Sequence, residues 1–134
     1  MADGKVKDRK LLNNQCLFHN MVFSGGLSVS DIDVAFEYRN KLFIDTEVKH
    51  INCRGIIPIG QRIMYERRAD MLSNNEGVSA YVLFAMHSED GDVDVGTLSV
   101  ELIYENGKWR SPSRSCTVRD FHQQKINMID RLGH

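Results

Sequence analysis

Acidic residues and a lysine are spaced so that two extended segments would bring them together. Asp31 and Asp33 are two residues apart, as are Glu47 and Lys49. Each pair would point to one face of a strand, and side chains on neighbouring strands come within about 5 to 8 Å. Two ionised carboxylates at that range repel each other unless a cation separates them. The pattern predicts a magnesium site, with Lys49 able to orient water or offset charge on a phosphate.

The segments that carry these residues are typical of a β-hairpin. Residues 31–38 alternate between polar and apolar side chains, which indicates a strand with one buried face. Residues 39–41 form a polar turn of hairpin length, and residues 42–49 alternate again. Pairing through this turn would place Asp33 and Glu47 on neighbouring strands.

A helix and a buried strand are expected after the hairpin. The helix is predicted from Gln61 to about Asn75, and the next strand is the nearly continuous apolar run of residues 78–87. Residues recurring at three- and four-residue steps predict one apolar stripe of the helix: Ile63, Met64, Arg67, Met71 and Leu72.

The two ends of the chain are predicted with less detail. A first strand is expected within residues 17–23, preceded over residues 1–14 by either a short helix or a basic arm. After residue 88, strands are expected at 97–104 and 108–110. The dipeptide Asn106-Gly107 between them predicts a tight turn. A closing helix is expected from Thr117 onward.

Together these features resemble the PD-(D/E)xK nuclease superfamily, which has a restriction-endonuclease-like fold. The resemblance covers roughly residues 15–87 and rests on three segments: Ser30-Asp31-Ile32-Asp33, Phe43-Ile44-Asp45-Thr46-Glu47-Val48-Lys49 and Ile59-Gly60-Gln61. It implies an α/β fold with an αβββαβ core, in which helices flank a central mixed sheet. The expected organisation is one domain over residues 1–134. Its parts are an arm or helix at 1–14, the core at 15–87, and a C-terminal strand pair with a helix at 88–134.

The resemblance also implies roles for individual residues. Asp33 and Glu47, with the Val48 carbonyl, would hold Mg²⁺ or Mn²⁺. Lys49 would assist the attack of water, and Gln61 would support the site.

Two departures from the family pattern bear on these roles. Ile32 stands where the classical motif has proline, which is a common relaxation of the pattern. Asp31 is the alternative to Asp33 for the metal-binding role. Many members carry a glutamate on the N-terminal helix, whereas the first glutamate of this chain is Glu37. A second metal position is therefore not implied.

Composition limits the partners and the compartment. Hydrophobic residues make up 42% of the 134-residue chain, the net charge is −1, and the mean hydropathy is −0.35, values that argue against a membrane protein. The N-terminus lacks the apolar run of a signal peptide. Three widely spaced cysteines, Cys16, Cys53 and Cys116, fit no zinc motif. They favour a reducing, cytoplasmic location.

Basic residues gather after the Glu-x-Lys motif and indicate a polyanionic partner. From residue 49 to residue 68 the only acid is Glu66, whereas the arginines in that stretch are Arg54, Arg62, Arg67 and Arg68. Such side chains supply sequence-independent affinity for phosphates. On a helix they are equally typical of an ordinary solvated face.

The function expected first is that of a magnesium-dependent endonuclease acting on DNA. A chain this small presents a limited DNA surface, so a homodimer is a reasonable extension. The alternative is a catalytically silent nuclease-like module that binds DNA or a protein partner. A third interpretation, a small-molecule-binding cone of strands and helix, leaves Asp33, Glu47 and Lys49 without a role.

Overall fold

The computed structural model describes residues 20, 22–23, 27–28, 32–53 and 57–132. These belong to two compact units that divide between residues 30 and 31. In the first unit, β1 (Val22–Phe23) pairs antiparallel with β2 (Leu27–Ser28). Of the strand predicted within residues 17–23, the described part Val22–Phe23 is β1. The helix or arm predicted at 1–14 lies outside the described residues.

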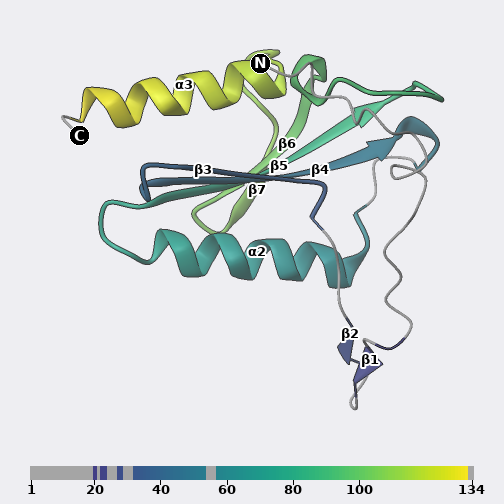
Figure 1. Ribbon diagram of the computed structural model, residues 1–134, viewed down its shortest axis with the longest axis horizontal. Coiled ribbons are helices and arrows are strands. Elements are labelled where there is room, and N and C mark those ends of the chain that lie inside the picture. The colour runs from purple at the N-terminus through teal and green to yellow at the C-terminus, as the bar shows by residue number, and fades with distance from the viewer. Residues whose placement is uncertain (1–19, 21, 24–26, 29–31, 54–56, 133–134) are drawn as a thin grey trace. The chain divides into compact units, whose positions relative to one another are not determined.

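The second unit is a five-stranded mixed sheet with one helix on each face (Figure 1). The strand order is β3-β4-β5-β6-β7, in which only the β4–β5 pair is parallel. This arrangement confirms the predicted α/β class and the mixed sheet flanked by helices. The strands are β3 (Val34–Tyr38), β4 (Leu42–His50), β5 (Ser79–His87), β6 (Val100–Glu105) and β7 (Lys108–Arg110), and the helices are α2 (Ile59–Ser73) and α3 (Val118–Arg131).

Two tight turns set the register of the antiparallel strands. Arg39 and Asn40 have φ angles of 54° and 59°, and Asn106 and Gly107 have 51° and 80°. Positive φ at both central residues matches the twist of paired strands, which explains why these positions join β3 to β4 and β6 to β7. In the first hairpin Val34 pairs with Thr46, so Asp33 lies beside Glu47 in the continued register.

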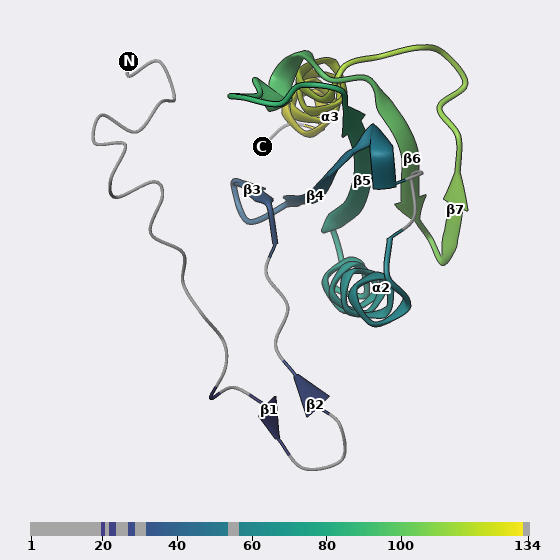
Figure 2. The ribbon, with the colours of Figure 1, turned by 90° about the vertical axis from the view of Figure 1, so that its right-hand side faces the viewer.

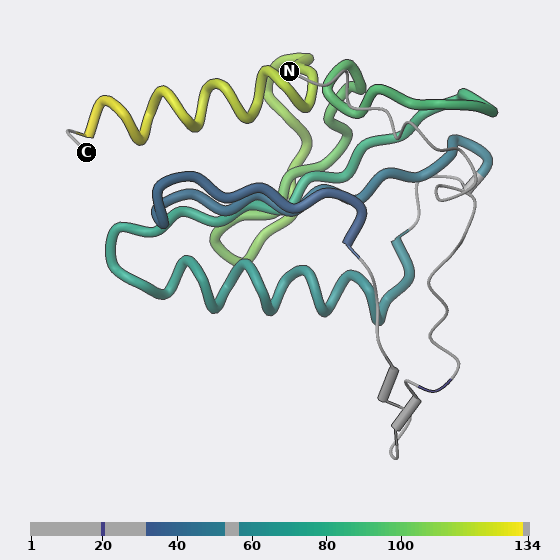
Figure 3. The backbone as a smooth tube through the Cα atoms, viewed as in Figure 1, coloured from purple at the N-terminus to yellow at the C-terminus, as the bar shows by residue number. Residues whose placement is uncertain are grey.

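Helix α2 connects the parallel strands β4 and β5 and covers one face of the sheet (Figure 3). Parallel strands need such a crossover because a tight turn reverses the chain. The predicted stripe of α2 was wrong at Arg67 and Met71, which are both exposed, Met71 to 73%. The buried residues of the helix are Tyr65 and Ala69. The helix turns this side to the sheet because Tyr65 supplies a hydrogen bond to a buried carboxylate of β4.

Helix α3 covers the opposite face and packs on the larger core (Figure 2). Its first turn has a capping box: Asp120 N–H donates to Thr117 Oγ1 at 3.0 Å, and Thr117 N–H donates to Asp120 Oδ2 at 3.2 Å. Phe121 and Ile129 of this helix are buried against the sheet. No helix in the described part of the chain has both the length and the apolar character needed to cross a membrane.

Thr46, on β4, is a buried polar residue whose hydroxyl group is not satisfied by a hydrogen bond within the described part of the chain. Its side chain is 0% exposed, and among the described residues its Oγ1 has no hydrogen-bond partner. Valine has nearly the same shape without the hydroxyl, so we expect Thr46→Val to raise the free energy of unfolding by about 1 kcal/mol. Urea denaturation measures this change.

A matched control is Thr97→Val, because the Thr97 hydroxyl is exposed and donates to the Asp94 carbonyl at 2.8 Å. We expect no gain in stability from that variant. A loss of stability in Thr46→Val would mean that its hydroxyl finds a partner in solution.

Candidate functional site

The centre of strand β4 carries three consecutive buried polar residues. Asp45, Thr46 and Glu47 are 7%, 0% and 2% exposed. β4 lies between β3 and β5, and alternation along the strand points Asp45 and Glu47 toward helix α2. Burying a carboxylate costs several kcal/mol unless partners compensate it. The hydrogen-bond and ion-pair partners of Asp45 and Glu47 therefore explain how each carboxylate is stabilised.

Asp45 has a structural partner. Arg68 Nε donates to Asp45 Oδ2 at 2.9 Å, which ties α2 to the sheet. The ion pair also raises the pKa of the Arg68 guanidinium, chiefly through this hydrogen bond.

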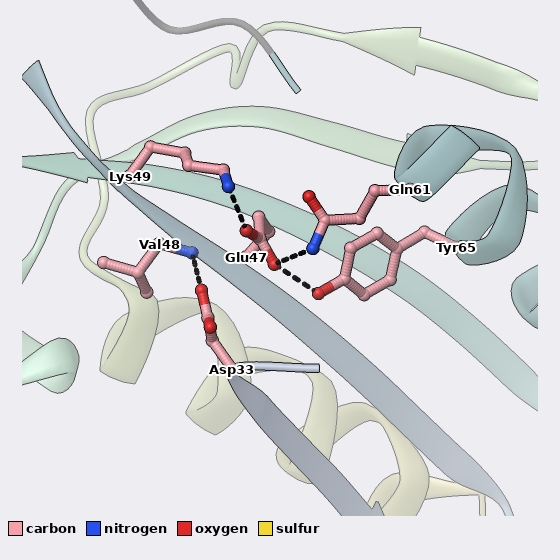
Figure 4. A network of polar contacts seen from close by, with 6 residues as sticks. All are labelled: Asp33, Glu47, Val48, Lys49, Gln61 and Tyr65. Carbon is pink, nitrogen blue, oxygen red and sulfur yellow. Dashed lines mark hydrogen bonds and ion pairs between the residues drawn. The ribbon is translucent and has the colours of Figure 1, made fainter. Parts of the chain in front are cut away.

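Glu47 is held by donors at both carboxylate oxygens (Figure 4). Tyr65 Oη donates to Oε1 at 2.5 Å, and Gln61 Nε2 donates to the same oxygen at 3.2 Å. Lys49 Nζ lies 2.9 Å from Oε2. Gln61 and Tyr65 are four residues apart and lie on one face of α2. The helix and the strand together fix the orientation of this carboxylate.

Asp33 lies just before β3 and reaches the same region from the edge of the sheet (Figure 4). Its Oδ2 accepts a hydrogen bond from Val48 N–H at 2.8 Å. The backbone of Asp33 also acts on the Tyr65 phenol and lowers its pKa. Tyr65 therefore interacts with both Asp33 and Glu47.

Burial changes the acid–base properties of this cluster. The pKa of Glu47 is raised by desolvation, while the hydrogen bonds from Tyr65 and Lys49 oppose that rise and the charge of Asp33 adds to it. Burial, followed by the hydrogen bond to Glu47, also raises the pKa of Tyr65. Tyr65 thus remains a protonated donor at neutral pH. Glu47 takes up a proton more readily than an exposed glutamate does.

This shift predicts a pH dependence of stability. Because the folded protein binds the Glu47 proton more tightly than the unfolded chain, the contribution is fully present below the unfolded pKa, which is near 4.5. It is lost as the pH rises through the folded pKa. We expect the free energy of unfolding, measured in urea with EDTA, to fall with pH above 4.5 more steeply in the wild type than in Glu47→Gln. Identical pH slopes would contradict a raised pKa at Glu47.

The donor set fits a hard divalent cation that keeps part of its water shell. In residues 32–53 and 57–132, no three His, Cys, Asp or Glu side chains gather as a metal-binding group. Magnesium is commonly bound through only one or two carboxylates plus water. Asp33 lies beside Glu47 in the continued register of β3 and β4, and its charge acts on the Glu47 carboxylate. Lys49 already neutralises part of their charge in this arrangement.

The structure brings together four of the predicted site residues: Asp33, Glu47, Lys49 and Gln61. Val48 joins them through its N–H, which binds Asp33, whereas the predicted role of its carbonyl stays a prediction. Asp31, the possible auxiliary acid, lies outside the described residues.

The arginines predicted to bind nucleic acid have different environments. Arg54 lies outside the described residues, and Arg67 is exposed on α2. Arg62 Nε lies 3.5 Å from Glu66 Oε2 on the same helix. Arg68 forms an ion pair with Asp45, so its guanidinium has a structural role in joining α2 to the sheet.

Tyr65 is the residue of the cluster that sequence reasoning missed. It is 0% exposed and makes the shortest hydrogen bond to Glu47. Its position four residues after Gln61 was the available signal, because residues so spaced share a helix face.

Comparisons with family models, curated proteins and solved structures give no match to this chain.

Proposed function

We propose that the chain is a metal-dependent nuclease that hydrolyses phosphodiester bonds of DNA through a PD-(D/E)xK-type site on a restriction-endonuclease-like core. The observation that carries the proposal is Glu47, which is 2% exposed, 2.9 Å from Lys49 and beside Asp33. Burying an acid is costly unless partners compensate it, and here three donors hold the Glu47 carboxylate. Two acids that can hold a metal ion, with an ammonium group beside them, are one arrangement that can hydrolyse a phosphodiester.

The order of elements supports the same proposal. The β3–β4 hairpin carries the acids and the lysine, α2 supplies supporting donors, and β5 returns parallel to β4. This is the sequence of elements expected of a restriction-endonuclease-like core from its second strand onward.

Asp33 and Glu47 would hold Mg²⁺ or Mn²⁺, with the Val48 carbonyl as a further oxygen. Such an ion supplies a Lewis acid that lowers the pKa of bound water and polarises a phosphate. Lys49 Nζ would orient the attacking water or stabilise charge on the phosphate oxygens. Gln61 and Tyr65 keep the Glu47 carboxylate aimed at one point.

Contacts with DNA would come from basic side chains around this face. Arg62 and Arg67 are exposed on α2, and Arg54 belongs to the connection between β4 and α2. Two copies of such a small domain would contact more of a duplex than one, so a homodimer remains part of the proposal.

Cleavage of supercoiled plasmid over a Mg²⁺ titration tests the proposal. We expect nicking that requires Mg²⁺ or Mn²⁺ and stops with EDTA. The Lys49→Ala variant should cut at least about a hundredfold more slowly, because the group that stabilises the developing charge is lost. Lys108→Ala, on the exposed edge strand β7, is the control and should cut at the wild-type rate.

The alternative, a silent module, makes the opposite prediction. DNA binding without cleavage at any metal concentration would support that module. Cleavage that survives Lys49→Ala would overturn the assignment of the site.

A further inference from the structure

A cavity lies on the α3 face of the sheet, away from the α2 donors that hold Glu47. Its volume is about 460 Å³. It is bordered by the end of β7, the loop of residues 111–116 that follows, and the first two turns of α3. Helices α2 and α3 cover opposite faces of the sheet, so the cavity and the Glu47 cluster belong to different layers (Figure 2). We call it the α3 cavity.

The charged residues that line the α3 cavity are mostly cationic. Arg110, Arg114 and Lys125 line it, and Asp120 is the single acid among its lining residues. Asp120 is already engaged, since its Oδ2 accepts the Thr117 N–H in the capping box of α3. Arg110 forms an ion pair with Glu105, so the local cationic excess comes from Arg114 and Lys125.

Lys125 is held in place by aromatic rings. Its Nζ lies 4.8 Å from the ring centroid of Tyr81 and 5.2 Å from that of Phe121. Both rings are buried, which fixes the end of an otherwise flexible side chain. Among the described residues, no carboxylate forms an ion pair with Lys125 or with Arg114. Their charges are thus available to an anion.

The remaining lining groups are suited to oxygen atoms of an anion. Ser113, Ser115 and Gln124 contribute hydroxyl and amide donors. Arg110 is oriented by Glu105, whose Oε1 accepts from Nε at 3.1 Å and from Nη2 at 2.7 Å. The Cys116 thiol stays neutral, because burial raises its pKa, and so adds no negative charge.

We propose that the α3 cavity binds a phosphate oxyanion, with Arg114 and Lys125 as its principal ligands. Arginine and lysine with hydroxyl donors are the side chains that recognise phosphate oxygens, and the volume lies in the range of small-ligand sites. The phosphate belongs either to a small phosphorylated molecule or to a nucleic acid. This site is separate from the proposed nuclease centre and does not depend on it.

Isothermal titration of the full chain in EDTA tests the proposal, with inorganic pyrophosphate as one probe and a twelve-residue oligothymidylate as the other. We expect saturable binding of pyrophosphate that weakens at least about tenfold in Arg114→Gln/Lys125→Gln. The control Lys41→Gln/Arg131→Gln removes the same charge at positions that do not line the cavity and should bind like the wild type. Arg114→Gln alone, at an exposed loop position, serves if the double variant does not fold.

The two probes distinguish the sources of the phosphate. Loss of pyrophosphate binding with unchanged oligothymidylate binding assigns the cavity to a small phosphorylated molecule. Loss of both assigns it to the phosphates of a nucleic acid. No pyrophosphate binding by the wild type, or equal weakening in the control variant, overturns the proposal.

Discussion

Glu47→Gln is expected to reduce metal-dependent plasmid cleavage at least about a hundredfold, because the amide removes the charge that would hold the cation. The substitution keeps the shape of the side chain and leaves an oxygen to accept from Tyr65 and Gln61. The fold should therefore persist, as circular dichroism and urea denaturation would show. Titration with Mn²⁺ should also show weaker metal binding than in the wild type.

Glu101→Gln provides the matched control for this substitution. Glu101 is an exposed glutamate of the same sheet, on strand β6. It should cleave and bind Mn²⁺ like the wild type. Undiminished cleavage in Glu47→Gln would remove the central acid from the proposed site.

Tyr65→Phe is expected to have the second large effect, although Tyr65 would act as a positioning residue. Its hydroxyl donates to Glu47, so its loss removes one of the donors that fix this carboxylate. Because the Tyr65 hydrogen bond lowers the pKa of Glu47, removing it should raise that pKa further. We expect the cleavage rate to fall by up to about tenfold. The rising limb of the pH–rate profile should move to higher pH.

Tyr104→Phe separates this effect from a general loss of packing. Tyr104 is also buried against α2, and its hydroxyl donates to Asp70 Oδ1 at 2.8 Å. Burial raises the pKa of Tyr104 to about 12, so it too is a protonated donor at neutral pH. This variant should leave the pH–rate profile unchanged. An equal shift in both variants would mean that Tyr65 acts only through stability.

Much of the fold could be predicted because short-range patterns carry it. The alternation of residues 31–38 and the apolar run of residues 78–87 correspond to β3 and β5. The turn at Asn106-Gly107 was predictable because that dipeptide readily adopts positive φ. The predicted strand at 97–104 begins later, at Val100, because residues 95–97 form a 3₁₀ turn capped by Asp94.

Which side of α2 faces the sheet could not be predicted from the residues of α2 alone. Apolar spacing favoured Met71 as part of the buried stripe, yet Met71 is 73% exposed and Tyr65 is buried. Which side of a helix faces a sheet depends on what the sheet presents. Here β4 presents the buried carboxylates of Asp45 and Glu47, which require donors from the helix.

By itself, the sequence determined the types and spacing of Asp33, Glu47 and Lys49 and the strands that carry them, because side-chain alternation is a local property of extended chain. Only the tertiary structure decided that Glu47 is buried and that Tyr65 joins it to Asp33. The tertiary structure also brought together the cations around the α3 cavity, which come from β7, a loop and α3. Burial and hydrogen bonding between distant segments depend on packing, which no local pattern records.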